Sequence, residues 1–392
     1  MTTHERVSPV TRALRRPHID LSDRPFIVIW EVTRACALAC RHCRAQAQPL
    51  PAPDELDTEQ GLALVDQVAD LGRPPPLFVL TGGDPFLRAD LPELIRHARA
   101  RKLPVGVSPS GTPTLTAAEL ARVRDAGAQT ISLSLDGANA STHDAFRGVP
   151  GSYDSTVRAW QEAQDLGFKV QINTSVTRSN VSELADIAHQ LHTRGALAWS
   201  LFFLVPTGRA TLDQQLSAQQ AEDVLHFAYD LDTILSTKAT EAPAFRRVCQ
   251  QRQRNPGAPP RNTGPTYRLL TERRRQLLPE TSETLRRPPL PVNAGNGFIF
   301  ISHTGEVYPS GFLPIAVGNV TEQPLHEIYR TAELLRDLRE PELLQGRCGA
   351  CGYRDVCGGS RARAYATTGD LFAADPLCPY QPGPELTVSG TA

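Results

Sequence analysis

Residues 31–48 read EVTRACALACRHCRAQAQ and carry three cysteines, Cys36, Cys40 and Cys43, in the pattern C-x3-C-x2-C. The group directly follows the apolar run FIVIWEV (26–32), so its thiols stand where a predicted strand ends. Tetrahedral zinc sites usually combine four ligands in closely spaced pairs, and no fourth ligand stands at such a spacing here. Three thiolates suit a cubane iron–sulfur cluster, in which the protein holds three irons and the fourth stays open to a small ligand.

The overall composition narrows the class of protein. A formal net charge of -1 and a pI near 6.8 give no general electrostatic reason to expect a nucleic-acid or membrane partner. The chain has no signal-peptide core and no run of about 18 apolar residues, so we expect a soluble cytoplasmic protein. Seven of the eight cysteines fall into two tight groups, which in a reducing compartment indicates metal binding rather than disulfides. Only Cys249 stands apart.

Short β-branched runs alternate with helical segments from about residue 25 to residue 210. The runs are residues 26–32, 77–80, 104–108, 130–135, 169–175 and 198–204. Thr116 and Glu119 form one capping box between them, and Gly127 can end the helix that follows. Continuous apolar strands that alternate with helices predict an α/β fold with a parallel sheet covered by helices. The pattern leaves open whether the sheet is a partial barrel or an open doubly wound sheet.

The second half of the chain has a different character. Residues 214–238 predict an amphipathic helix, and the basic, proline-rich stretch after it predicts a solvated linker, with a lid for an anionic substrate as the alternative. Residues 297–320 predict a hairpin with its turn at 303–306, followed by a helix at 324–339. The expected units are an N-terminal extension (1–24), a barrel (25–210), a helical and proline-rich basic linker (211–290) and a C-terminal domain (291–392).

The segment CALACRHC at 36–43 matches the C-x3-C-x-Φ-C signature and so resembles the radical S-adenosylmethionine (SAM) enzymes, with His42 at the usually aromatic position. In that superfamily a 4Fe-4S cluster binds SAM at its open iron, and an electron cleaves SAM to a 5′-deoxyadenosyl radical. The resemblance implies that Cys36, Cys40 and Cys43 are the catalytic cluster ligands. It also implies a partial (β/α)6 TIM-type barrel, which answers the question that the strand pattern leaves open.

Further residues at the predicted strand ends match the SAM contacts of this family. TGGDP at 81–85 resembles its Gly-Gly-Glu-Pro motif, with Asp84 in place of the glutamate, and the backbone of Gly82 and Gly83 would hold the SAM amino group. The resemblance also implies Ser134 and Asp136, Arg147 for the SAM carboxylate, Asn173 and Thr174 for the ribose, and Gly208 in the turn VPTGRA. Read singly, each has a plain explanation as a turn, a helix cap or a surface arginine. Their order after successive strands favours the functional interpretation.

The second cysteine group has the pattern C-x2-C-x5-C-x20-C and consists of Cys348, Cys351, Cys357 and Cys378. By itself it could hold a structural zinc. Downstream of such a barrel it resembles the C-terminal SPASM or twitch extension, and four thiolates complete one auxiliary 4Fe-4S cluster. Ser310 and Ser360 stand where related sequences often have cysteine, so we expect one auxiliary cluster rather than two. Cys249 is expected to be an incidental loop residue.

The stretches GEVYPSGFLP, CGGSRARAYATTGD and DPLCPY resemble the branch that contains heme-pathway radical enzymes, including alternative heme synthase, and peptide maturases. This favours oxidative decarboxylation of a tetrapyrrole side chain, with maturation of a ribosomally synthesised peptide as the alternative. Arg209, Arg361 and Arg363 are candidates for binding tetrapyrrole carboxylates. The implied partner is an electron donor such as flavodoxin or ferredoxin, with no nucleic acid and no membrane. A non-enzymatic zinc-binding protein is the alternative from another class.

Overall fold

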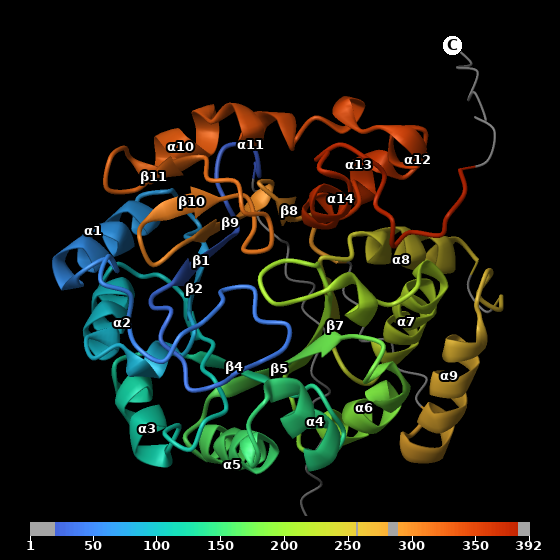
Figure 1. The fold of residues 1–392 in the computed structure, drawn as a ribbon, viewed down its shortest axis with the longest axis horizontal. Helices are drawn as coiled ribbons and strands as arrows, with labels where there is room; N and C mark the ends of the chain where they lie inside the picture. Colours follow the sequence, from blue (N-terminus) through green and yellow to red (C-terminus); the bar gives the residue numbers. More distant parts are fainter. Residues whose placement is uncertain (1–19, 256–257, 281–288, 383–392) are drawn as a thin grey trace, which may run out of the picture.

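The computed structural model describes residues 20–255, 258–280 and 289–382, and a single sheet runs through its centre (Figure 1). Along the sheet the strands lie in the order β11-β10-β9-β1-β2-β3-β4-β5-β6-β7, and β8 pairs with β9. The barrel strands, which pair in parallel, are β1 Ile27–Glu31, β2 Leu77–Thr81, β3 Val105–Val107, β4 Thr130–Ser134, β5 Lys169–Val176, β6 Ala198–Phe203 and β7 Thr237–Thr240. The end strands β11 and β7 do not pair with each other in the described part of the chain, which confirms a partial barrel.

The six strands expected from the sequence correspond to β1–β6. Side-chain burial alternates along several of them, as a sheet with one covered face requires. In β4, Ile131 and Leu133 are fully buried in the main hydrophobic core, whereas the alternate residues are half-buried. On this other face Ser134, Asn173 and Ser200 stand in register across β4, β5 and β6. A row of polar side chains therefore crosses this face of the sheet from the carboxyl end of β4.

Helices cover the outer face of the parallel strands (Figure 1). They are α1 Thr58–Ala69, α2 Leu91–Ala100, α3 Ala117–Asp125, α4 Ala140–Arg147, α5 Ser152–Asp165 and α6 Leu184–Thr193, with short 3-10 turns η1 Pro85–Leu87, η2 Val181–Glu183 and η3 Leu212–Gln214. The first helix begins with a capping box, because Asp57 accepts a hydrogen bond from the Gln60 N–H (2.9 Å) and Gln60 Oε1 accepts one from the Asp57 N–H (3.0 Å). Thr116 caps α3 as the sequence predicts.

The segment expected to be a linker is part of the packed protein. It contains α7 Ala218–Leu231, the strand β7, α8 Ala244–Arg254 and α9 Pro265–Leu277. The helix predicted to run to residue 238 ends at Leu231, because the Asp232 carboxylate accepts a hydrogen bond from the Thr237 N–H (2.8 Å) and turns the chain into β7. Cys249 lies in α8, buried in the main core, so its expected place in a loop is wrong. The apolar faces of these helices outweigh the basic composition that indicated a linker.

The C-terminal domain extends the sheet beyond β1. It contains β8 Asn293–Ala294, β9 Gly297–Ile301, β10 Glu306–Tyr308, β11 Gly318–Asn319, α10 Leu325–Thr331, α11 Glu333–Asp337, η4 Pro341–Leu343, α12 Gly346–Gly349, α13 Arg354–Cys357 and α14 Arg361–Thr368. The antiparallel pair β9–β10 confirms the predicted hairpin, and β9 pairs in parallel with β1. The helix predicted at 324–339 is interrupted at Ala332, whose extended backbone separates α10 from α11. The pairing with β1 brings the two cysteine-bearing parts of the chain into one sheet.

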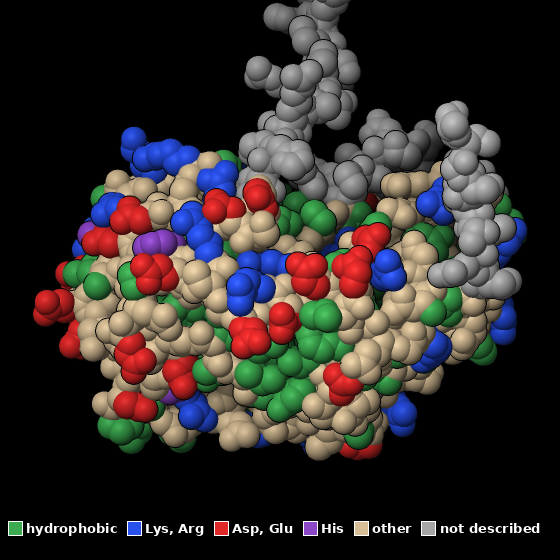
Figure 2. Space-filling model, turned by 90° about the horizontal axis from the view of Figure 1, so that it is seen from above, with side chains coloured by type: hydrophobic (Ala, Val, Ile, Leu, Met, Phe, Trp, Pro, Cys, Tyr) green, Lys and Arg blue, Asp and Glu red, His purple; other side chains and the backbone are tan. Residues whose placement is uncertain are grey.

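Acidic and basic side chains are interspersed on the face of the molecule shown in Figure 2, in line with the formal net charge of -1. Among the residues that the structure describes, no helix has the length and apolar character needed to cross a membrane.

Arg363 joins the C-terminal domain to the barrel. Its guanidinium is 1% exposed, forms an ion pair with the buried Asp375 (3.2 Å) and donates to the carbonyl oxygens of Phe203 (3.2 Å) and Leu204 (3.3 Å) at the end of β6. It also donates to the carbonyl oxygen of Glu241 (2.6 Å), just after β7. The side chain in α14 thus satisfies backbone groups where two barrel strands end, and it compensates a buried carboxylate.

Arg363→Ala is expected to lower the free energy of unfolding by about 3–5 kcal/mol, because it leaves the buried Asp375 carboxylate without its cation. Chemical denaturation followed by circular dichroism measures the change. Arg330→Ala is the control, because Arg330 and Asp23 form an ion pair whose side chains are 46% and 50% exposed. Its removal should change the free energy by less than about 1 kcal/mol. Equal losses in the two variants would contradict the role of Arg363 as the link between the domains.

Candidate functional site

The cysteine loop, residues 32–48, begins where β1 ends and brings three thiols together. Cys36 and Cys40 are buried and pack with Leu38, and Cys43 packs against them. Nearby polar groups surround the sulfurs: the Leu38 N–H lies 3.4 Å from Cys36 Sγ and the Ala47 N–H donor lies 3.5 Å from Cys43 Sγ. Donors aimed at sulfur stabilise thiolates and cluster sulfurs, so this donor set fits a cluster held by three cysteines.

The TGGDP turn after β2 presses against the start of the cysteine loop. The Gly83 N–H donates to the Thr33 carbonyl oxygen (2.8 Å) and the Asp84 N–H donates to the Ala35 carbonyl oxygen (2.6 Å). A Cβ atom on Gly83 would lie 2.3 Å from the Ala35 oxygen, and one on Gly82 would lie 2.5 Å from the Thr33 oxygen. Both positions therefore require glycine because two backbones touch there. The structure places the motif beside the cysteine loop. The Gly83 N–H is hydrogen-bonded to the protein backbone.

Asp84 lies 1% exposed behind the first cysteine. Its carboxylate accepts hydrogen bonds from the N–H groups of Phe86 (3.2 Å) and Ser110 (3.4 Å). Burial raises the pKa of Asp84 to about 6, against the opposing effect of these donors. The Ser110 hydroxyl lies 3.3 Å from Cys36 Sγ and donates to the Gly83 carbonyl oxygen (2.8 Å). Ser110 thus belongs to the site, although its position in the loop after β3 carries no recognisable motif.

Arg147 connects two residues expected at the site to a cysteine. Its guanidinium forms an ion pair with the fully buried Asp136, and Nη1 donates to Cys40 Sγ (3.6 Å). Asp136 also accepts a hydrogen bond from the Ser175 N–H (2.7 Å). The resemblance assigned this arginine to the SAM carboxylate, whereas in the structure its partners are a carboxylate and a sulfur of the protein. Its positive charge is therefore balanced locally, next to the cysteine loop.

His42 stacks on Phe146 of α4, with ring centroids 4.4 Å apart and planes 20° apart. Burial lowers the pKa of His42 well below its ordinary value, and the neighbouring Arg147 and Arg209 act in the same direction, so the ring is neutral. Its Nδ1 has no hydrogen-bond partner among the described residues. The imidazole thus serves as a flat aromatic surface, as the signature position requires.

The expected ribose contacts lie on opposite faces of β5. Asn173 is half-buried and stands in register with Ser134 of β4 on the polar face. Thr174 is fully buried on the other face, where its hydroxyl donates to the Leu135 carbonyl oxygen (2.6 Å) and accepts from Trp199 Nε1 (2.8 Å). Consecutive residues of a strand point to opposite faces, so Thr174 cannot share a ligand with Asn173. The expectation for Thr174 is wrong, because its hydroxyl is hydrogen-bonded to other groups in the core.

The turn after β6 also touches the cysteine loop. Gly208 has φ +62, and a Cβ atom there would lie 2.4 Å from the Cys43 carbonyl oxygen. The Arg209 N–H donates to that same oxygen (3.0 Å). The Nε and Nη2 atoms of Arg209 are buried and have no partner among the described residues. This close approach of two loops explains the glycine, and Arg209 remains a candidate for binding an anion.

The second cysteine group converges as the sequence predicts. All four of its cysteines line one pocket, together with Arg247, Gly358, Gly359 and Tyr380. The Asp375 N–H points to Cys348 Sγ (3.4 Å) and the Tyr353 N–H to Cys351 Sγ (3.5 Å). Burial raises the pKa of the Cys357 thiol to about 12, so this residue becomes a thiolate only with a compensating charge such as a metal cluster. The four thiols and their N–H donors fit a fully ligated cluster.

Ser310 and Ser360 meet at one carboxylate. Their hydroxyls both donate to Glu241, to Oε1 at 2.8 Å and to Oε2 at 2.5 Å. Glu241 follows β7 and has φ +54, an uncommon conformation for a residue with a side chain. The two positions expected to carry cysteine in related sequences are thus adjacent in space and joined by hydrogen bonds. All cysteines of the chain other than Cys249 belong to the two groups, which leaves no second auxiliary set.

Two arginines proposed as substrate ligands have partners within the protein. Arg361 is 4% exposed and donates to the carbonyl oxygens of Leu371 (2.8 Å) and Ala373 (2.9 Å). Arg363 forms the link to Asp375 and the barrel strands described above. Neither guanidinium is available to a substrate carboxylate, so both expectations are wrong. An Arg-x-Arg pattern does not distinguish arginines that face a ligand from those that satisfy backbone carbonyls.

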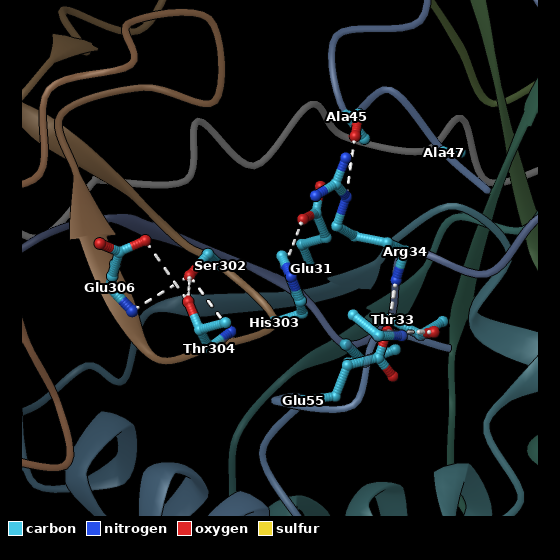
Figure 3. A network of polar contacts seen from close by, with 12 residues as sticks. Glu31, Thr33, Arg34, Ala45, Ala47, Glu55, Ser302, His303, Thr304 and Glu306 are labelled. Atoms are coloured by element: carbon cyan, nitrogen blue, oxygen red, sulfur yellow. Dashed lines mark hydrogen bonds and ion pairs between the residues drawn. The ribbon is translucent and has the colours of Figure 1, made fainter. Parts of the chain in front are cut away.

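A network that no sequence motif indicates ties the cysteine loop to the C-terminal hairpin (Figure 3). The buried Glu31 at the end of β1 forms ion pairs with Arg44 (3.0 Å) and with His303 Nδ1 (3.0 Å) in the β9–β10 turn. Burial opposes its ionisation, but Arg44 and His303 hold the pKa of Glu31 below its ordinary value. Arg34 Nε donates to the Ala45 carbonyl oxygen (3.0 Å) and closes the loop. Glu31 and His303 are 272 residues apart, so only the fold brings this pair together.

Gly208→Ala is expected to displace the cysteine loop, because its Cβ would overlap the Cys43 carbonyl oxygen. We expect a loss of about 2–4 kcal/mol of unfolding free energy and a lower iron content after anaerobic reconstitution. Gly151→Ala is the matched control, since Gly151 also has a positive φ (+80) but nothing within 4 Å of the added Cβ. It should lose only the backbone strain, about 1 kcal/mol, and keep its iron. Equal iron contents in the two variants would contradict this role of Gly208.

Comparison with known proteins confirms the resemblance seen in the cysteine motifs. Residues 30–191 match the Radical SAM superfamily, and residues 293–352 match SPASM, an iron-sulfur cluster-binding domain. The chain is 42% identical to the AdoMet-dependent heme synthase of Oleidesulfovibrio alaskensis, over 91% of this chain and 87% of that protein. It is 30% identical to the mycofactocin maturase MftC of Mycobacterium tuberculosis, over 95% of this chain and 87% of that protein.

Solved structures agree on the fold. Streptococcus suis SuiB bound to the precursor peptide SuiA superposes with a TM-score of 0.66 at 14% sequence identity, covering 91% of this chain and 76% of that chain. The matching family models place the SAM-cleaving 4Fe-4S cluster in the barrel and an auxiliary iron–sulfur cluster in the C-terminal domain, where the structure gathers the two cysteine groups. The chain belongs to the radical SAM superfamily and carries a C-terminal SPASM domain.

Proposed function

We propose that this enzyme oxidatively decarboxylates a propionate side chain of a tetrapyrrole. The observation that carries the proposal is the 42% identity to a protein named AdoMet-dependent heme synthase, which extends over nearly the whole of both chains. An active site is conserved together with its substrate more often at this identity and coverage than in a relative that shares only the fold. The single auxiliary cysteine set also suits an oxidation that releases one electron.

The reaction requires a hydrogen-atom acceptor and an electron acceptor. One hydrogen atom leaves the methylene next to the ring, and the bond to the carboxylate carbon then breaks. Carbon dioxide and a vinyl group form, and one electron is released. Cys36, Cys40 and Cys43 would hold the cluster that binds SAM, and SAM would supply the hydrogen-atom acceptor. The pocket of Cys348, Cys351, Cys357 and Cys378 supplies the place for the released electron.

The residues of the barrel hold and shape the site for SAM. Cys36, Cys40 and Cys43 would be its cluster ligands, and the backbone contacts of Gly82, Gly83 and Gly208 fix the loop that carries them. Asp84 acts through Ser110 on Cys36, and Asp136 acts through Arg147 on Cys40. The ring of His42 and the polar side chains of Ser134 and Asn173 would contact SAM from the loop and the strands. A flavodoxin or ferredoxin is the proposed electron donor.

The direct test uses coproheme, SAM and a reductant with anaerobically reconstituted protein. We expect a shift of the coproheme absorbance on binding, formation of 5′-deoxyadenosine, and a product lighter by one carbon dioxide and two hydrogens per side chain in mass spectrometry. Cleavage of SAM without any change in coproheme would contradict the tetrapyrrole assignment while leaving the radical chemistry intact.

Peptide maturation is the second candidate, because the chain is also 30% identical to a mycofactocin maturase over 95% of its length. A short peptide frame beside the gene, and a mass change of that peptide with SAM and reductant, would support this candidate. A peptide maturase would cleave SAM but leave coproheme unchanged. The coproheme assay therefore separates the two functions.

Single cysteine variants separate the roles of the two cysteine groups. Cys40→Ala should abolish 5′-deoxyadenosine formation, because the barrel cluster loses one of its three ligands. Cys357→Ala should still cleave SAM without coupling but form no vinyl product, because the released electron has no acceptor. Chromatography of 5′-deoxyadenosine and of the tetrapyrrole measures both quantities. Vinyl product from Cys357→Ala at the native rate would contradict the role of the second group.

A further inference from the structure

Arg246 is a buried cation without an acidic residue to balance it. It lies in α8, 8% exposed, and its guanidinium donates only to neutral oxygens. These acceptors are the carbonyl oxygens of Leu290 (3.1 Å), Val292 (3.1 Å), Val356 and Cys357 (3.0 Å), and the side-chain oxygen of Asn293 (2.7 Å). No described residue forms an ion pair with it, and the acidic group that interacts with its charge is the Cys357 thiol.

A buried guanidinium without an acidic partner lowers the stability of the fold unless an anion lies near it. Removing a guanidinium from water costs several kcal/mol, and hydrogen bonds to neutral carbonyls return only part of that. The fold nevertheless places this charge directly behind Cys357, because α8 packs against α13, which ends at that cysteine (Figure 1). A 4Fe-4S cluster with four thiolate ligands carries a net negative charge, so it would supply the missing anion.

The next residue, Arg247, faces the same site. It is 1% exposed and lines the pocket of the four cysteines. Its guanidinium forms a buried ion pair with Glu222 of α7 (2.5 Å), and its Nε has no partner among the described residues. Arg354 also lines this pocket, but it is 42% exposed and pairs with Glu342 and Asp355, so solvent screens its charge. Arg361 of α14, 4% exposed, donates to Cys348 Sγ (3.8 Å). Buried arginines of α8 and α14 therefore act most strongly on the pocket.

At the first cysteine group, in the barrel, the arginine next to the sulfurs is balanced by a carboxylate. The arginine that reaches its sulfurs, Arg147, is neutralised by the buried Asp136. An uncompensated cation stabilises the more negative, reduced form of a nearby cluster, whereas a neutral ion pair has little effect on it. The arginine charge is thus balanced at the barrel site and unbalanced at the second site, and that difference favours electron flow toward the second site.

We infer that Arg246 of α8 is the uncompensated counter-charge of the auxiliary cluster and raises its reduction potential, so that the cluster accepts the electron released by the substrate; Arg247 beside it is paired with Glu222. Glu222 opposes this effect by neutralising Arg247. The inference rests on the proposed electron-acceptor role of the second cysteine group. Neither arginine touches substrate; both are positioning residues that act through the cluster.

The test is a potentiometric titration of the auxiliary cluster, monitored by electron paramagnetic resonance in the Cys40→Ala background so that only one cluster contributes. Arg246→Gln should make reduction harder, lowering the ratio of reduced to oxidised cluster about tenfold at a fixed potential, which is ~59 mV for one electron. Glu222→Gln should shift the potential in the opposite direction, because Arg247 then carries an uncompensated charge. Opposite shifts distinguish electrostatic tuning from structural damage, which has no reason to change sign.

Arg252→Gln is the matched control, because Arg252 lies on the same helix but pairs with Asp230 and does not line the cysteine pocket. Its potential should stay at the native value. Unchanged potentials in Arg246→Gln and Glu222→Gln, with iron content intact, would overturn the inference and leave the acceptor role standing. Shifts of the same sign would also overturn it. If Arg246→Gln does not retain the cluster, the inference is tested by Glu222→Gln alone, whose reduction potential should be higher than that of the native protein. A native protein without an auxiliary cluster would instead refute the acceptor role itself.

Discussion

The site depends on backbone packed directly against backbone around the cysteine loop. The TGGDP turn meets the start of the loop at Gly83, and the turn after β6 meets its end at Gly208. Each contact leaves no room for a Cβ atom, so both neighbours fix the loop without any side chain between them. Backbone contacts of this kind restrict the loop before a cluster binds, and such preorganisation reduces the entropy lost on binding.

The C-terminal domain is built into the same framework. The pairing of β9 with β1 places His303 beside Glu31, and Glu31 in turn holds Arg44 of the cysteine loop. On the far side of the barrel, Arg363 joins α14 to the ends of β6 and β7. The two cysteine groups are therefore parts of one rigid arrangement of strands.

Charge distinguishes the two sites more than ligand number does. Near the cysteine loop the arginine in contact with sulfur is paired with Asp136, whereas behind Cys357 a buried arginine has only neutral acceptors. Ser310, Glu241 and Ser360 form a hydrogen-bonded group at the position where related sequences often carry more cysteines. There a carboxylate and two hydroxyls satisfy one another, so the space is filled without a metal.

The sequence alone determined the features that depend on local spacing. The C-x3-C-x2-C and C-x2-C-x5-C-x20-C patterns, the six strands and their order all follow from residues close together in the chain. The tertiary structure decided which polar groups are free and which are occupied. Thr174, Arg361 and Arg363 are bound within the protein, and Arg246 lies behind Cys357 on a helix that composition assigned to a linker. No local sequence pattern specifies these partners, and a hydrogen bond forms only where folding brings its donor and acceptor together.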